Sequence, residues 1–178
     1  MAGQKCAQKC VTEAVTTRML GVLSNSGGRA ETVAAAVAVC RAGGADYVLH
    51  LGDIGGRHVL DALASAGPSG FVWGERDTDR MGLLRYGHSV GVECLGMIGE
   101  FELAHKRVVA VHGDDRKILR KLLDEQQHDY VLVGHEMTVE DYTVGRTRVL
   151  NPGPLHGGAG SSAMLLDPAT GKIKLLPI

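Results

Sequence analysis

The sequence predicts an α/β fold of four layers, α-β-β-α, in which two mixed sheets pack face to face and are flanked by helices. In the first half, strand-like apolar runs alternate with helix-like segments, which is typical of parallel strands joined by crossover helices. The second half instead holds pairs of short apolar runs joined by tight turns, which indicates antiparallel hairpins. Two packed sheets with helices outside accommodate both patterns better than one open sheet does.

One folded domain is expected over residues 19–178, after a flexible polar tail over residues 1–18. The 178 residues are enough to bury a substantial core, and 44 % of them are hydrophobic. Because only 4 % are aromatic, this core must consist mainly of Val, Leu, Ala and Ile.

The first half is expected to begin with three strands, at residues 19–24, 47–51 and 71–73. Helices are expected between them, at residues 29–42 and 57–66. Gly43-Gly44 and Gly67-Pro68 follow these helices, and glycine and proline commonly end a helix. Residues 78–99 have a weaker pattern, which we interpret as a short helix and then a strand.

Three hairpins are expected in the second half, at residues 101–104 with 107–111, 138–144 with 147–150, and 163–166 with 172–176. Asp114 or Asp115 is expected to cap a helix that runs to about residue 127, because a carboxylate accepts hydrogen bonds from the free N–H groups of the first turn. Residues 130–133 are expected to form one more strand.

Charge and cysteine content favour an ordinary cytoplasmic protein. The formal net charge is −1 and no strongly basic face is apparent, which argues against nucleic acid as the main partner. We find no signal peptide and no apolar stretch long enough to span a bilayer. The four cysteines do not form a zinc-binding pattern, so we interpret them as reduced thiols, with Cys40 buried: Cys6, Cys10, Cys40 and Cys94.

Four apolar runs each lead into a residue that can bind a metal, namely Asp53, Glu75, His112 and His135. Each has a simpler explanation when taken alone: a helix cap for Asp53, an ion pair for Glu75, and a buried, hydrogen-bonded ring for either histidine. The carboxyl ends of parallel strands share one edge of a sheet, so we expect the four side chains to meet there. Two imidazoles and two carboxylates suit a divalent transition metal.

The order of short motifs along the chain carries a family resemblance. The motifs are Leu23-Ser24-Asn25-Ser26-Gly27, Gly52-Asp53, Gly74-Glu75-Arg76-Asp77, Val111-His112-Gly113, Gly134-His135-Glu136-Met137 and Asn151-Pro152-Gly153. Over residues 19–178 the chain resembles the calcineurin-like metallophosphoesterases. It is most similar to their small single-domain phosphodiesterase branch, which includes the retromer scaffold subunit.

The resemblance implies a reduced metal centre. In the family two metals share a bridging aspartate, which falls here on Asp53. The second metal would be bound by Asp53, Glu75, His112 and His135, with Glu75 in place of the family's asparagine. Three first-metal positions are altered and expected not to bind, namely Asn25, Gly27 and Met137. We therefore expect a mononuclear site for one divalent ion, and the ligand types do not distinguish Mn, Zn, Fe and Ni.

Arg76 occupies the position at which many members of this family carry a catalytic histidine. Its guanidinium can bind a pair of phosphate oxygens, but it is too basic to donate a proton near neutral pH. We therefore interpret Arg76 as a candidate phosphate-binding residue.

Two functions are compatible with these features. One is a metal-dependent phosphodiesterase or phosphatase, a hydrolase with weak or specialised activity towards a phosphodiester or a phosphorylated small molecule. The alternative is a catalytically inactive pseudoenzyme that acts as a binding or scaffold module for a protein partner. A mononuclear iron oxygenase follows from the ligand types alone, and the family resemblance disfavours it.

Overall fold

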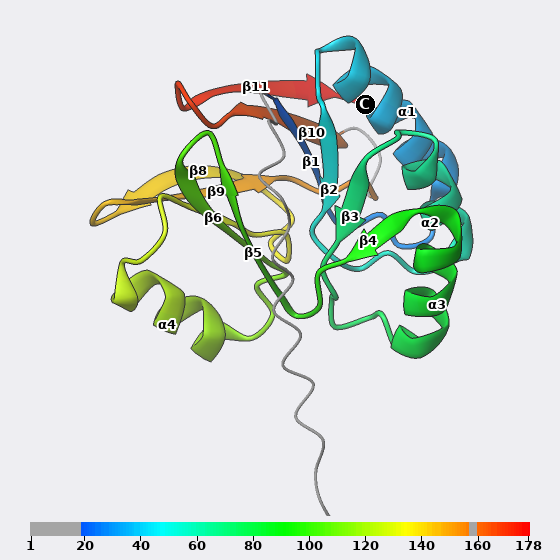
Figure 1. Cartoon of the computed structure of the whole chain (residues 1–178), viewed down its shortest axis with the longest axis horizontal. Helices are drawn as coiled ribbons and strands as arrows, with labels where there is room; N and C mark the ends of the chain where they lie inside the picture. Colours follow the sequence, from blue (N-terminus) through cyan, green and yellow to red (C-terminus); the bar gives the residue numbers. More distant parts are fainter. Residues whose placement is uncertain (1–18, 157–159) are drawn as a thin grey trace, which may run out of the picture.

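The computed structural model describes residues 19–156 and 160–178, so the predicted tail over residues 1–18 lies outside the described residues. Two sheets face each other, with three helices on the outside of one sheet and one helix on the outside of the other (Figure 1). The helices are α1 (Ala30–Ala42), α2 (Arg57–Ala64), α3 (Arg80–Val90) and α4 (Arg116–Glu125). The expected four-layer α-β-β-α sandwich is confirmed.

The first sheet has six strands in the order β11-β10-β1-β2-β3-β4. Its parallel part consists of β1 (Leu20–Leu23), β2 (Tyr47–His50), β3 (Ser69–Phe71) and β4 (Val92–Cys94). The hairpin of β10 (Ser162–Asp167) and β11 (Lys172–Pro177) joins the antiparallel side of β1. The sheet is therefore mixed, as expected.

The second sheet has five strands in the order β5-β6-β7-β9-β8. They are β5 (Ile98–Leu103), β6 (Lys106–Val111), β7 (Tyr130–Leu132), β8 (Val139–Val144) and β9 (Thr147–Pro152). Two of the three expected hairpins form the antiparallel pairs β5/β6 and β8/β9 in this sheet. Strand β7 runs parallel to both β6 and β9. All three expected hairpins are thus present.

Three apolar layers hold the sandwich together. Leu49, Leu51 and Leu132 belong to the cluster between the two sheets, where they are fully buried. A second cluster packs α1, α2 and α3 onto the six-stranded sheet, and it includes the buried thiol of Cys40. The third cluster is the smallest and packs α4 onto the five-stranded sheet. Because Leu122 is the one buried residue of α4, this helix is the least firmly packed of the four.

Local boundaries differ from the sequence expectation mainly at β3. This strand pairs with β2 from Ser69 to Phe71, two residues earlier than the apolar run suggested, because the N–H of Trp73 donates to Gly96 outside the strand ladder. The ambiguous region resolves as α3 followed by β4. Asp115 caps α4 by accepting from the N–H groups of Lys117 and Ile118. Within the described residues, no helix is both long and apolar enough to cross a membrane.

Candidate metal centre

The site lies where the loops after β2, β6 and β7 meet. Asp53 follows β2 by three residues, is only 5 % exposed, and has a φ of 57°. A side chain at Gly52 would stand 2.7 Å from the backbone nitrogen of Gly74 and 2.8 Å from Nδ1 of His112. A side chain at Gly74 would collide with the Asp53 carboxylate. The glycines before the acidic residues therefore allow these loops to approach each other.

Asp53 and His112 form the buried centre of the site. Nε2 of His112 lies 3.4 Å from Oδ1 of Asp53, and both side chains are almost completely buried. On the other side of the ring, Nδ1 lies 2.6 Å from the backbone oxygen of Leu51. A carbonyl oxygen can only accept, so Nδ1 carries the proton of this bond. In the neutral ring, Nε2 then carries no hydrogen, and its lone pair faces Oδ1 of Asp53.

Two acceptors facing each other require a positively charged species between them, either a proton on Nε2 or a metal ion. Nε2 of His112 is buried and has no hydrogen-bond partner among the described residues. A backbone carbonyl that fixes one ring nitrogen while the other faces outward is the usual support of a metal-binding histidine. Two ligands of one tetrahedral ion, with bonds of about 2.1 Å, lie about 3.4 Å apart. Asp53 and His112 therefore fit a divalent ion.

His135 stands beside this pair. Its ring centroid lies 5.4 Å from that of His112, and the two ring planes meet at 76°. The backbone N–H groups of Gly134 and His135 both donate to the carbonyl of His112, each at 2.8 Å. These bonds hold the loop after β7 against the end of β6, so the predicted meeting of the two histidines occurs.

Glu75 is placed differently. Its side chain is exposed, and no hydrogen bond or ion pair of this carboxylate occurs within residues 19–156 and 160–178. In the same described part of the chain, no three His, Cys, Asp or Glu side chains are arranged to hold a metal ion. The structure thus places His112 next to Asp53 and next to His135, but does not arrange the three to hold an ion, and it leaves Glu75 at the surface. The expectation that the four side chains meet at one edge of one sheet is wrong, because β2 and β3 belong to the six-stranded sheet whereas β6 and β7 belong to the five-stranded one. The four-ligand set stays a prediction.

Arg76 contacts the centre through both its backbone and its side chain. Its N–H donates to Oδ1 of Asp53 at 3.0 Å, and its Nε lies 3.6 Å from Oδ2 of the same residue. The Arg76 side chain is 65 % exposed, so the guanidinium combines a contact to the buried carboxylate with access to solvent. This position is compatible with the expected phosphate-binding role.

Asp77 is a supporting residue whose role the sequence did not reveal. Its carboxylate accepts from the backbone N–H groups of Asp53, Gly55 and Gly74, at 3.0, 3.1 and 2.9 Å. Burial raises the pKa of Asp77, against the opposing effect of these hydrogen bonds. The residue joins the loops after β2 and β3, which fixes the backbone on which Asp53 and Arg76 stand.

The altered first-metal positions are filled by other contacts. The Asn25 amide donates from Nδ2 to the carbonyl of Gly134 at 2.6 Å, and Nδ2 also lies 3.6 Å from the sulfur of Met137. Gly27 has a φ of 54°, and a side chain there would lie 3.4 Å from the ring of His156. Asn25 therefore bridges two loops, and a Cβ at position 27 would lie in van der Waals contact with the His156 ring.

His50 lies beneath the site and is fully buried. Its Nε2 is 2.9 Å from Oγ of Ser26. Burial, aided by the neighbouring His112, lowers the pKa of His50 to about 3, so the ring is neutral at physiological pH. The sequence around His50 did not predict that this histidine supports the loop that contains Ser26.

Comparisons with known proteins agree on the fold. Residues 19–171 match the family model described as the calcineurin-like phosphoesterase superfamily domain. No curated protein matches the chain. A structure described as a novel archaeal phosphodiesterase is similar over 90 % of this chain and 99 % of its own, with 17 % identity and a TM-score of 0.80.

Two further structures show the range of proteins that share this fold. Yfce, a phosphoesterase from E. coli, has 18 % identity and a TM-score of 0.64, covering 90 % of this chain and 99 % of its own. Vps29 from Entamoeba histolytica, complexed with Zn²⁺, has 18 % identity and a TM-score of 0.58, covering 90 % of this chain and 98 % of its own. At these identities the likeness shows the fold alone, while the family model covers most of the sequence. The chain therefore belongs to the calcineurin-like phosphoesterase superfamily.

Proposed function

We propose that this protein is a metal-dependent phosphoesterase in which Asp53 and His112, joined by His135 after a rearrangement of side chains, would bind one divalent ion. The observation that carries the proposal is the unpaired Nε2 of His112, buried opposite the Asp53 carboxylate. Leaving a buried polar atom unpaired costs about 1–3 kcal/mol. An ion would remove this cost, and Vps29 from Entamoeba histolytica, which has the same fold, is described in complex with Zn²⁺.

Glu75 is proposed as a fourth ligand that would have to move. Its exposed carboxylate lies two residues before Asp77, whose bonds fix the loop backbone. Ordering an exposed glutamate side chain costs up to about 1.5–2 kcal/mol of rotamer entropy, which the attraction between its carboxylate and a lone divalent ion would have to exceed.

The bound ion would polarise a phosphate oxygen and lower the pKa of a water molecule. The chain's own groups would act around it. Leu51 holds the His112 ring with Nε2 directed at the site, because its carbonyl accepts from Nδ1. The exposed guanidinium of Arg76, already beside Asp53, would bind a substrate phosphate and neutralise charge that develops on its oxygens. Asp77 keeps both residues in place through the loop backbone.

The proposal is tested by counting ions and measuring hydrolysis on the same samples. Purified protein is stripped, dialysed against Mn²⁺ or Zn²⁺, and analysed for metal, and bis-p-nitrophenyl phosphate hydrolysis is then measured. We expect about one ion per chain, and a loss of at least about 100-fold in affinity for His112→Ala, since even outer supporting residues typically contribute 10–100-fold. His88→Ala, on the exposed face of α3, is the matched control.

Absence of bound ion and of hydrolysis in the unmodified protein would refute the proposal. So would ion binding and hydrolysis that His112→Ala leaves unchanged.

A non-catalytic scaffold is the second candidate, supported by the Asn25 bridge. An amide that hydrogen-bonds to Gly134 across the first-metal position leaves that position closed by neutral groups. A stoichiometric protein partner recovered from native lysate, together with ion binding but no hydrolysis of phosphodiesters, would support the scaffold. Robust turnover without such a partner would exclude it.

A further inference from the structure

Strand β8 is an open edge of the five-stranded sheet. It pairs with β9 alone, in a continuous antiparallel register from Val139 to Val144. In the described part of the chain, the one other hydrogen bond to its backbone runs from Nε2 of Gln126 to the carbonyl of Val144, at 3.0 Å. The outward N–H and C=O groups along the rest of this edge are therefore available to a further strand.

The other three sheet edges of the described chain carry features that discourage pairing, whereas β8 does not. Natural sheet edges are protected by short strands, lysine, proline or irregular backbone. Strand β4 has only three residues, and β11 contains Lys172, Lys174 and Pro177. Strand β5 contains Gly99, which weakens a strand interior. The sequence of β8 is Val-Glu-Asp-Tyr-Thr-Val, which has none of these residues and favours an extended strand.

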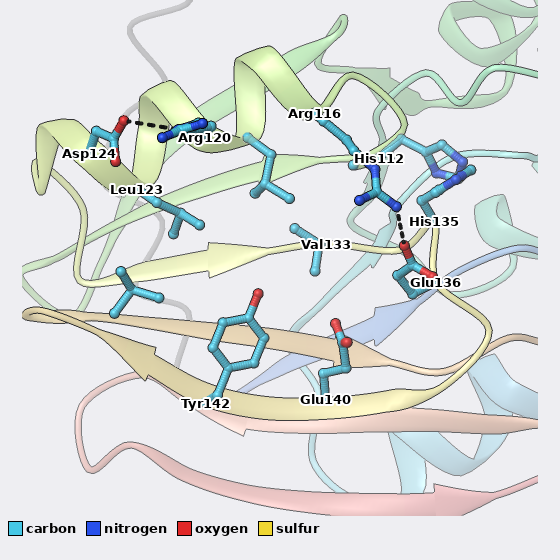
Figure 2. Close-up of a pocket in the computed structure, with 13 residues that line it drawn as sticks. His112, Arg116, Arg120, Leu123, Asp124, Val133, His135, Glu136, Glu140 and Tyr142 are labelled. Carbon is cyan, nitrogen blue, oxygen red and sulfur yellow. Dashed lines mark ion pairs between the residues drawn. The ribbon is translucent and has the colours of Figure 1, made fainter.

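One face of β8 also forms a wall of a groove beneath α4. The groove has a volume of about 410 Å³, and alternate residues of the strand line it, namely Glu140, Tyr142 and Val144. Figure 2 shows the Glu140 and Tyr142 side chains directed from β8 towards α4. Leu119 and Leu123 of α4 line the opposite wall. A strand added beside β8 would continue this face, so that its alternate side chains would extend the groove.

The groove contains one carboxylate more than its arginines pair with. Arg116 lies 3.6 Å from Glu136, and Arg120 lies 3.7 Å from Asp124 (Figure 2). Glu140 has no hydrogen bond or ion pair within the described ranges 19–156 and 160–178. The charge that is left uncompensated in the groove is therefore negative and belongs to the open edge itself.

We propose that β8 is the docking edge for an extended segment of a partner protein, which adds a strand to the sheet and places a lysine or arginine beside Glu140 and Tyr142. In strand addition, main-chain hydrogen bonds supply affinity and alternate side chains supply specificity. Residues opposite each other on neighbouring strands are close enough to form an ion pair. The Tyr142 ring keeps 42 % of its surface exposed, so a cation can also rest against it.

The chemistry of the edge favours a basic segment over a second copy of this chain. Strand β8 has no lysine or arginine, so the same edge of another copy supplies no cation for Glu140. Apolar residues on either side of the partner's cation would lie on the same face of the added strand and extend the apolar wall of Leu119 and Leu123. Neither Asp53 nor a bound ion takes part in this contact.

Two peptides that differ in one charge test this assignment. Acetyl-Thr-Val-Thr-Lys-Thr-Val-Thr-amide, and the same peptide with Glu in place of Lys, are titrated into the ¹⁵N-labelled full chain and followed by NMR. We expect the Lys peptide to shift the amide signals of residues 139–144 and to bind about fivefold more tightly than the Glu peptide, since an exposed ion pair and a cation–π contact each contribute a small factor. A Lys peptide with proline in place of both valines keeps the charge but cannot form the ladder, and should not shift these signals.

Two protein variants separate the Glu140 charge from general electrostatics. Glu140→Gln keeps the shape of the side chain and removes its charge, so the preference for the Lys peptide should fall to about twofold or less. Glu102→Gln removes an exposed carboxylate from the edge strand β5, outside the groove, and should leave the preference unchanged.

Failure of the Lys peptide to shift the β8 amides, equal affinities for the Lys and Glu peptides, or a preference that Glu140→Gln leaves unchanged would overturn the proposal. Equally tight binding of the proline peptide would overturn the added strand. Shifts of the β8 amides that grow with protein concentration, without any peptide, would assign this edge to a second copy and would likewise overturn the proposal.

Discussion

Replacing Asn25 with Asp tests whether position 25 faces a cation site, as the family resemblance implies. Nδ2 of Asn25 donates to the Gly134 carbonyl, and a carboxylate cannot donate in its place. The backbone is not disturbed, because Asp tolerates a φ of 53° as readily as Asn does. The Gly134 carbonyl also keeps the hydrogen bond from Oγ of Ser24, at 2.9 Å. The substitution therefore removes the bond to Gly134 and the longer Nδ2 contacts to the His135 carbonyl and the Met137 sulfur, and it adds one charge.

The magnitude follows from these two changes. Losing one of the two hydrogen bonds at Gly134 should cost about 1 kcal/mol. Burial beside a carbonyl should raise the pKa of the new carboxyl, and each unit of rise costs about 1.4 kcal/mol once the group must ionise. Because the folded state would hold the proton more tightly, this second cost is absent below about pH 4 and grows as pH rises to the folded pKa. If the rise is about two pKa units, the total is about 1 kcal/mol of destabilisation near pH 4 and roughly 3–4 kcal/mol near pH 8.

Urea denaturation at these two pH values, with and without Mn²⁺, measures the effect. An ion captured by the new carboxylate at 100 times its Kd would restore about 2.7 kcal/mol. Asn151→Asp is the matched control, since Asn151 also donates from Nδ2 to a backbone carbonyl, that of Glu136, at 3.0 Å. If Mn²⁺ stabilises Asn25→Asp no more than it stabilises the unmodified chain and Asn151→Asp, position 25 does not face a cation site.

Three further outcomes are expected. Between about pH 6 and pH 4, the unfolding free energy of the unmodified chain should fall by up to about 1.4 kcal/mol per pH unit more than that of His50→Gln. The reason is that the folded state keeps His50 neutral, so protonation of this residue below its unfolded pKa of about 6.5 favours the unfolded state. Parallel pH profiles of the unfolding free energy for the two proteins would contradict this. Gly74→Ala should weaken Mn²⁺ binding in equilibrium dialysis, because the added methyl group displaces the Asp53 carboxylate, whereas Gly56→Ala, which points into open space, should bind normally. Asp115→Ala should lower the unfolding free energy by about 1 kcal/mol through loss of the α4 cap, and an equal effect of Asp114→Ala would argue against that cap.

Much of the architecture could be predicted because hydrophobic period and turn residues act locally. Alternating runs and glycine stops located β1, α1, β2 and α2, and paired runs located the three hairpins. The bounds of β3 could not be predicted from the sequence, because they depend on which backbone groups form hydrogen bonds with β2 and with Gly96. The exposure of Glu75 escaped for a similar reason: the Asp77 carboxylate fixes the backbone of its loop through bonds to residues up to 24 positions away.

The candidate site was predictable in its residue types and less so in its contacts. The family resemblance alone implied that positions 25, 27 and 137 lack first-metal ligands, and this stays a prediction. The bridge from Asn25 to Gly134 joins residues 109 positions apart, and no local pattern announces it. The ring of His156 over Gly27 likewise depends on how the loop after β9 packs against the loop after β1.

Position 25 and the Asp53–His112 pair differ in their hydrogen bonding. At the first-metal position the chain supplies its own donor, because the Asn25 amide binds the Gly134 carbonyl that a carboxylate would oppose. At the second position it supplies only acceptors, since Nε2 of His112 and Oδ1 of Asp53 face each other while Leu51 holds the ring in that orientation. A side chain with a donor at position 53, such as Asn, would have satisfied Nε2 without any ion. The carboxylate instead leaves two acceptors facing each other, which either a proton on Nε2 or a cation between them would satisfy.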